Sequence, residues 1–193
     1  MSRSWYSIKA SGTGDSGVAD ISIHEEIGFW GIEARQFLAE LNRLDVPLIN
    51  LSINSPGGSV YEGLAIFRGL KDHKARVVAK IEGYAASMAT VIAQAADEIQ
   101  IPENSVFLVH RIYAGVAGDP DEIQAHAEDM RKVEDMLVNI YMGTFTGTEE
   151  ELRAMLSRET ILNGTEAVEK GFATTLLPEF AAAAVDSAWV RGI

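Results

Sequence analysis

Two segments of the sequence combine hydrogen-bonding or reactive groups with a turn that leads into a helix. The first, residues 53–60 (Ile-Asn-Ser-Pro-Gly-Gly-Ser-Val), leaves an apolar run through two glycines. Consecutive backbone N–H groups at the positive end of a helix can bind an oxyanion or a phosphate. The same segment also suits a simple strand-to-helix connection. It therefore indicates an anion-binding turn only if other motifs in the sequence support that interpretation.

The second segment, residues 83–89 (Gly-Tyr-Ala-Ala-Ser-Met-Ala), places Ser87 among small side chains directly after another apolar run. A strand-to-helix turn of this kind can hold a serine hydroxyl open to a cleft, as a nucleophile requires. The segment does not match the Gly-x-Ser-x-Gly pattern of hydrolases. The alternative is a serine that begins a helix and packs among alanines. Ser87 therefore needs a nearby base before it indicates catalysis.

The four histidines differ in their surroundings. His110 closes the apolar run of residues 106–109, at the edge where open α/β sheets bind their ligands. His73 and His126 lie in charged or polar surroundings that are typical of solvated side chains, and nothing beside His24 suggests a role. We therefore expect His110 to be the base, with a carboxylate elsewhere to orient its imidazole.

These segments belong to a regular alternation of apolar runs and amphipathic stretches. Apolar residues three and four apart predict helices, and short continuous apolar runs predict buried strands. Strands that alternate with helices are typical of an α/β fold with a largely parallel sheet. We expect strands at residues 18–23, 48–53, 75–82, 98–101 and 106–109, and helices at 32–44, 60–70, 85–96, after 119 and after 147.

The longest helical pattern follows Asp119, which suits the N-cap position with Pro120 as the first helical residue. Thr148 opens the next helix with a sequence close to a capping box. No repeat or linker divides the chain, so we expect a single domain over residues 1–193, in which 1–17 and 181–193 can be flexible. The apolar stripe predicted to line one side of the long helix is Ile123, Ala127, Met130, Val133, Leu137 and Ile140.

Composition excludes several classes of function. The 28 acidic and 16 basic side chains give a net charge of −12, which disfavours nucleic acid as a partner. The absence of cysteine excludes disulfides and thiolate chemistry, and no ligand spacing indicates a metal, so we expect no metal and no cofactor. No apolar run reaches the ~18 to 20 residues that cross a bilayer, and the N-terminus lacks the apolar core of a signal peptide. We expect a cytoplasmic protein that does not bind membranes.

Three motifs in order resemble those of the ClpP-like serine peptidases, the proteolytic subunits of Clp proteases. They are Asn-Ser-Pro-Gly-Gly at residues 54–58, Glu-Gly-Tyr-Ala-Ala-Ser-Met-Ala at 82–89, and Val-His at 109–110. The similarity continues to the segment 158–173 and covers roughly residues 18–177. Three ordered motifs at suitable spacing are far more specific than any one of them.

The resemblance implies a role for each matching residue. Ser87 matches the nucleophile of the family and His110 its general base. The backbone N–H groups of Gly58 and Met88 match the donors that stabilise the oxyanion. Substrate is expected to bind as an extended strand beside Gly57 and Ser59 and along the loop after His110.

The third member of the triad is a departure from the family. Glu159 stands where the family usually has aspartate. Glutamate is one methylene longer, yet it can still accept a hydrogen bond from the imidazole Nδ1–H. If Glu159 points away, Asp119 and Asp121 are the alternatives.

The resemblance also implies an architecture. A ClpP/crotonase-like spiral of βαβ units is expected, with the long helix after His110 acting as a handle that pairs with another ring. The family forms homo-oligomeric rings, six- or seven-fold, which can stack and enclose the active sites. Two departures, Arg111-Ile112 in place of Gln-Pro and a different N-terminal region, resemble the head maturation proteases of phages and prophages.

The leading prediction is therefore a serine endopeptidase that matures capsid or scaffold proteins inside a phage prohead or an oligomeric chamber. The first alternative is a housekeeping-type Clp subunit that works with an ATPase unfoldase. The second is a crotonase-type acyl-CoA enzyme, in which two N–H groups of such a turn hold an enolate. The third is an inactive structural subunit, which the Glu159 departure favours.

Overall fold

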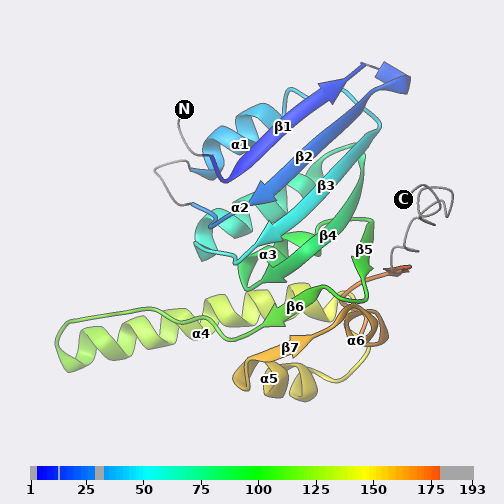
Figure 1. The fold of residues 1–193 in the computed structure, drawn as a ribbon. Helices are drawn as coiled ribbons and strands as arrows, with labels where there is room; N and C mark the ends of the chain where they lie inside the picture. Colours follow the sequence, from blue (N-terminus) through cyan, green and yellow to red (C-terminus); the bar gives the residue numbers. More distant parts are fainter. Residues whose placement is uncertain (1–3, 13, 29–32, 179–193) are drawn as a thin grey trace, which may run out of the picture.

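Strands with inward-facing isoleucine, leucine and valine form the centre of the molecule (Figure 1). The computed structural model describes residues 4–12, 14–28 and 33–178. Four strands run parallel in sequence order: β2 (Val18–His24), β3 (Leu48–Ser55), β4 (Arg76–Ala86) and β5 (Glu98–Pro102). The predicted α/β fold with a mostly parallel sheet is thus confirmed.

Strand β4 is long enough to serve two parts of the sheet. Its residues 78–80 pair with β5, whereas residues 84–86 pair with β6 (Val106–Val109), in both cases parallel. Strand β6 in turn pairs antiparallel with β7 (Thr160–Leu162). The sheet therefore divides along β4, and β6 carries the chain toward the lower part of the molecule (Figure 1).

The structure corrects the predicted boundary between β4 and the helix after it. The sequence predicts a strand at 75–82 and a helix from residue 85, but β4 continues to Ala86 and α3 (Met88–Ala93) begins only at Met88. Backbone pairing explains the difference, because Ala85 is opposite both Ser55 of β3 and Phe107 of β6. Pairing with two neighbours outweighs the helix preference of alanine.

The sequence analysis also missed a strand near the N-terminus. β1 (Tyr6–Ser11) pairs antiparallel with β2 along its whole length, and a single 3₁₀ turn (Gly14–Ser16) follows it. Part of the segment 1–17, which we expected to be flexible, is therefore an edge strand. Residues 181–193, the other such segment, lie outside the described residues.

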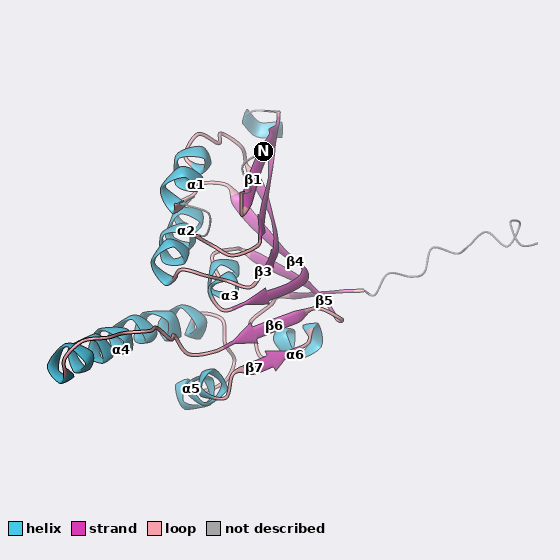
Figure 2. Ribbon diagram, turned by 60° about the vertical axis from the view of Figure 1, so that its left-hand side comes forward, coloured by secondary structure: helices cyan, strands magenta, loops and turns pink. Residues whose placement is uncertain are grey.

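Three helices cover one face of the sheet (Figure 2): α1 (Ala34–Leu41), α2 (Val60–Asp72) and α3. The long helix α4 (Pro120–Met142) projects away from this layer, and α5 (Glu149–Ser157) and α6 (Gly164–Glu169) complete the lower part. The predicted caps are confirmed, since Asp119 and Thr148 each form a capping box. No helix within the described ranges is long and apolar enough to cross a membrane.

The buried face of α4 differs from the predicted stripe. Glu134, Leu137, Val138 and Tyr141 are buried, whereas Ile123 is 41% exposed. Of the six predicted positions only Leu137 is buried. The first half of α4 extends beyond the sheet, so in a single chain its apolar residues meet little of the core (Figure 1).

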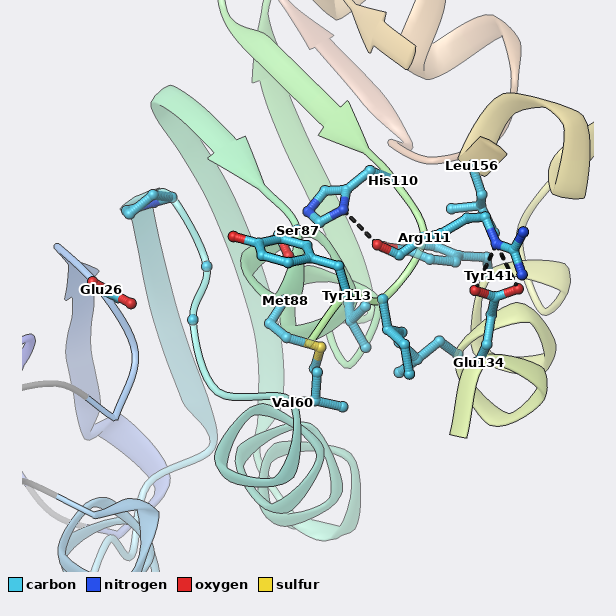
Figure 3. A pocket seen from close by; sticks show the side chains of 16 residues that line it. Glu26, Val60, Ser87, Met88, His110, Arg111, Tyr113, Glu134, Tyr141 and Leu156 are labelled. Atoms are coloured by element: carbon cyan, nitrogen blue, oxygen red, sulfur yellow. Dashed lines mark hydrogen bonds and ion pairs between the residues drawn. The ribbon is translucent and has the colours of Figure 1, made fainter. Parts of the chain in front are cut away.

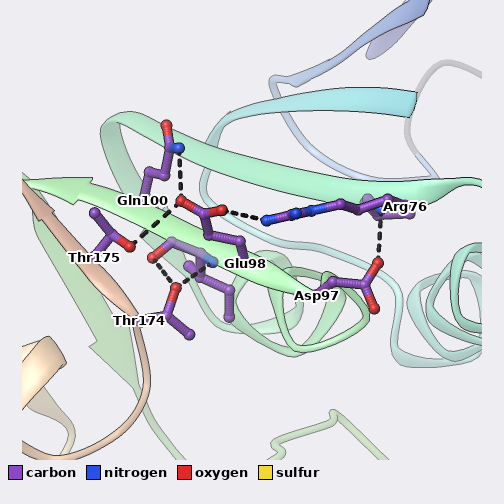
Figure 4. Close-up of polar contacts among 8 residues, drawn as sticks. Arg76, Asp97, Glu98, Gln100, Thr174 and Thr175 are labelled. Carbon is purple, nitrogen blue, oxygen red and sulfur yellow. Dashed lines mark hydrogen bonds and ion pairs between the residues drawn. The ribbon is translucent and has the colours of Figure 1, made fainter. Parts of the chain in front are cut away.

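Side chains as well as backbone attach the last strand, β8 (Thr175–Leu177), to β5 (Figure 4). Thr174 Oγ1 accepts a hydrogen bond from Ile99 N–H (2.8 Å) and donates one to Ile99 O (3.1 Å). The Glu98 carboxylate accepts from Gln100 (2.9 Å) and from Arg76 of β4 (2.7 Å). The hydrogen bond from Gln100, together with the charge of Arg76, lowers the pKa of Glu98.

Replacing Glu98 by glutamine should make the free energy of unfolding less dependent on pH in the acidic range. A lowered folded-state pKa stabilises the protein above the unfolded value of about 4.3, and this stabilisation disappears as the pH falls through the folded value. Urea unfolding between about pH 5 and pH 3 should therefore show a larger loss for the wild type than for Glu98→Gln. Glu103→Gln, an exposed site in the turn after β5, should behave like the wild type. Equal pH dependence in wild type and Glu98→Gln would contradict this assignment.

Candidate active site

Ser87 occupies a strained turn between β4 and α3. Its φ of 55° and ψ of −128° lie in a region that residues with a side chain rarely adopt. Although Ser87 precedes the first residue of α3, its hydroxyl does not cap the helix. Ser87 thus begins a helix, as the alternative expects, but its hydroxyl is not used as a cap. Strain of this kind persists only where the surrounding structure holds it, and it is frequent at functional sites.

A buried series of hydrogen bonds holds the Ser87 turn from the side of α4. Thr90 Oγ1 donates to Ser87 O (2.6 Å), and Tyr141 OH lies 2.6 Å from Thr90 Oγ1. Because the single hydroxyl proton of Thr90 is used on Ser87, Tyr141 must donate to Thr90. Burial raises the pKa of Tyr141, which keeps this donor protonated.

Strand β6 brings His110 to the same edge of the sheet as Ser87. Ala86 and Leu108 are opposite each other in the parallel pair, and Ser87 N–H donates to Leu108 O (3.0 Å). Both Ser87 and His110 line a cavity of about 430 Å³ (Figure 3). The structure thus brings together the two residues that the sequence analysis paired. Among the described residues no hydrogen bond joins the Ser87 hydroxyl to the imidazole, so the pair is not closed in this structure.

The hydrogen bonding of His110 fixes its tautomer. The Nδ1 atom lies 2.6 Å from the backbone oxygen of Arg111, and a carbonyl oxygen can only accept. Nδ1 therefore carries a proton, and Nε2 has no hydrogen-bond partner among the residues that the structure describes. An imidazole in this form can accept a proton from a serine hydroxyl.

Gly57 and Gly58 bring a second turn into backbone contact with the Ser87 turn. Gly57 has φ +91°, and a Cβ there would lie 2.6 Å from Ala86 O and 2.8 Å from Met88 N. A Cβ on Gly58 would lie 2.3 Å from Ile27 O. Only glycine fits positions with such dihedral angles and such close backbone neighbours.

Hydrogen bonds with the segment after β2 hold the glycine turn in place. Ile27 N–H donates to Gly57 O (2.7 Å), and Ser59 N–H donates to Ile27 O (3.1 Å). These hydrogen bonds do not use the N–H of Gly58. Met88 is the first residue of α3, so its N–H makes no hydrogen bond within the helix. Neither N–H has a hydrogen-bond acceptor in the part of the chain that the structure describes. Both remain available to a bound oxyanion.

Glu159 is not among the residues that line the cavity. It is exposed and follows α5 with φ 54°, in the left-handed position that often ends a helix. Its backbone N–H donates to Leu156 O (3.2 Å), and within the described ranges its carboxylate makes no hydrogen bond to His110. The predicted orienting role of Glu159 therefore has no support from the contacts of this structure.

The alternative carboxylates and Ser59 also lie outside the cavity. The Asp119 carboxylate accepts from the backbone of Asp121 and Glu122 and caps α4, whose start lies far from the sheet (Figure 1). Ser59 caps α2 by accepting from Glu62 N–H. Of the remaining histidines, His24 contacts the Glu82 carboxylate at 3.1 Å. Gly57, in contrast, does line the cavity.

The sequence analysis missed a charged pair in the cavity wall. Arg111 Nε lies 3.1 and 3.0 Å from the two carboxylate oxygens of Glu134 (Figure 3). The hydrogen bond to Glu134 raises the pKa of Arg111. A signal was present in the sequence, because Glu134 shares a helix face with Leu137 and Tyr141, and an acid on such a face needs a partner.

The arrangement suits acyl transfer. A serine at a strained turn, a neighbouring imidazole with a free Nε2 and two unpaired N–H groups are the parts that attack a carbonyl and bind the resulting oxyanion. No group of three histidine or acidic side chains in the described ranges is placed to hold a metal ion.

Gly57→Ala should displace the N–H of Met88 and slow acyl transfer by about a hundredfold, as the loss of one oxyanion donor does. The burst of nitrophenol from p-nitrophenyl acetate measures this step. Gly115→Ala is the matched control, because a Cβ at Gly115 meets open space. A Gly57→Ala burst as fast as that of Gly115→Ala would contradict the described contact.

Comparison with known proteins agrees with this geometry. A model of the Clp protease family matches residues 32–179, which include both turns and His110. The ATP-dependent Clp protease proteolytic subunit of Deinococcus radiodurans is 33% identical over 126 residues, which are 64% of this chain and 61% of that subunit. The subunit of the same name from Bdellovibrio bacteriovorus is 32% identical over 146 residues, 72% of this chain and 68% of that subunit. The match spans less than two thirds of the Deinococcus relative. The chain belongs to the Clp protease family.

Proposed function

We propose that this chain is a serine peptidase. The Ser87 hydroxyl attacks the peptide carbonyl while His110 Nε2 accepts its proton, and the imidazolium then protonates the leaving amine. Water hydrolyses the acyl-enzyme by the same route, which regenerates Ser87. The N–H groups of Gly58 and Met88 bind the oxyanion. The observation that carries the proposal is that two groups line one cavity. They are a strained Ser87, whose hydroxyl does not cap α3, and the His110 imidazole, which carries its proton on Nδ1.

The proposal does not depend on Glu159. The family resemblance alone assigns that residue the orienting role, whereas Nδ1 of His110 is bound to the Arg111 carbonyl here. Gly57 and Ser59 belong to the proposal as the segment along which an extended peptide binds, since a strand edge can pair with substrate backbone. The alternative function as an acyl-CoA enzyme has less support, because enolate chemistry needs neither a strained serine nor an imidazole base.

We further propose that the chain works as a Clp-type proteolytic subunit in a homo-oligomeric ring with an ATPase unfoldase. The names of both relatives support this function over prohead maturation, which rests only on Arg111-Ile112 and the N-terminal region. The exposed apolar residues on the first half of α4 and the loop before it, including Ile123 and Val116, supply a surface for subunit contacts.

Ser87→Ala and His110→Ala should each lower hydrolysis of a fluorogenic peptide at least about 10⁴-fold, since the two groups act as a unit. His73→Ala is the matched control for loss of an imidazole, because His73 ends α2 away from the cavity. Full peptidase activity in Ser87→Ala or His110→Ala would contradict the proposed roles.

Dependence on an ATPase distinguishes the two biological settings. The Clp-type function predicts that a folded, tagged protein is degraded only when a Clp unfoldase and ATP are present, and that peptides are cleaved without them. Cleavage of a capsid or scaffold protein by the chain alone, with no gain from unfoldase and ATP, would instead support prohead maturation. Gel analysis of both substrates decides between these outcomes.

A further inference from the structure

We propose that Glu134 and Arg111 position the general base: the Glu134 carboxylate fixes Arg111, and the backbone carbonyl of Arg111 orients the His110 imidazole. The inference rests on the proposed function and adds two positioning residues to it. Both residues line the cavity, and their proposed role is to position the base.

Arg111 is held on three sides. Its N–H donates to Leu156 O at the end of α5 (3.1 Å), and its guanidinium Nε contacts both oxygens of Glu134 on α4 (3.1 and 3.0 Å). Its carbonyl accepts the Nδ1–H of His110 (2.6 Å). Residue 111, whose carbonyl accepts from the imidazole, is therefore held by contacts with two other elements of the fold (Figure 3).

The burial of Glu134 makes this pair different from a surface ion pair. The Glu134 side chain is 11% exposed, whereas that of Arg111 is 54% exposed. A carboxylate withdrawn from water needs its partner, so the pair has one preferred geometry. Exposed pairs hold their geometry weakly, because water and salt compete with them.

The next residue of α4 offers a contrast within the same helix. Asp135 pairs with Arg153 of α5 (2.7 Å), but its side chain is 56% exposed. Arg153 also binds Glu149 (2.8 Å), so loss of Asp135 leaves it a second partner. The two acids thus serve different purposes: Asp135 joins two surface helices, whereas Glu134 reaches the residue beside the base.

The consequence for catalysis is specific to the chemical step. If the pair is broken, residue 111 is less constrained, so its carbonyl can turn away and the imidazole loses its fixed acceptor. Ser87 is then deprotonated less often, which lowers kcat. KM should change little, because the glycine turn that binds the peptide backbone lies on the other side of the cavity, away from Glu134.

Steady-state hydrolysis of a fluorogenic peptide by the full chain tests the proposal. Glu134→Gln removes the charge but keeps the shape, and we expect at least a tenfold lower kcat with KM within twofold of the wild type. Asp135→Asn, the matched control, should keep the kcat of the wild type. Combining Arg111→Glu with Glu134→Arg restores the pair in reverse and should recover part of the kcat lost in Arg111→Glu alone.

Two results would overturn the proposal: a wild-type kcat in Glu134→Gln, or a charge-reversed double variant no faster than Arg111→Glu. Either result leaves the serine peptidase function standing, provided that the wild type cleaves the peptide and Ser87→Ala does not. An inactive wild type would overturn the proposed function, and this inference with it. Should circular dichroism show that Glu134→Gln is unfolded, Arg111→Gln, which changes a more exposed side chain and keeps the carbonyl, decides the question by the same kcat criterion.

Discussion

The parallel pairing of β4 with β6 is the interaction on which the proposed active site depends. Ala86 and Leu108 are opposite each other, so the chain leaves both strands at one edge of the sheet. Ser87 follows the first of these residues directly, and His110 follows the second by two positions. A shift of one residue in this register would turn the side chains of β6 to the opposite face and separate the nucleophile from its base.

Helix α4 connects this edge to the rest of the molecule. Tyr141 reaches the Ser87 turn through Thr90, and Glu134 reaches the residue beside His110 through Arg111. Both contacts come from the buried second half of the helix, whereas the first half projects from the chain (Figure 2).

Much of this arrangement could be predicted from the sequence, because it is encoded locally. The alternation of strands and helices, the Asp119 cap and the turns at Gly57 and Ser87 all follow from residue types at short spacing. What could not be predicted depends on contacts between distant segments. The extension of β4 to Ala86 requires both neighbouring strands, and the partner of Glu134 lies 23 residues away in the chain. The family pattern placed Glu159 beside the base, whereas the structure places a backbone carbonyl there.

Reaction with a fluorophosphonate tests the central claim most directly, because the reagent reports an activated serine without knowledge of the substrate. Intact-mass spectrometry of the wild type should show a single adduct, which peptide mapping places on Ser87 and which Ser87→Ala lacks. Absence of an adduct, or an adduct that persists in Ser87→Ala, would contradict the claim that β4 and β6 assemble a working serine nucleophile.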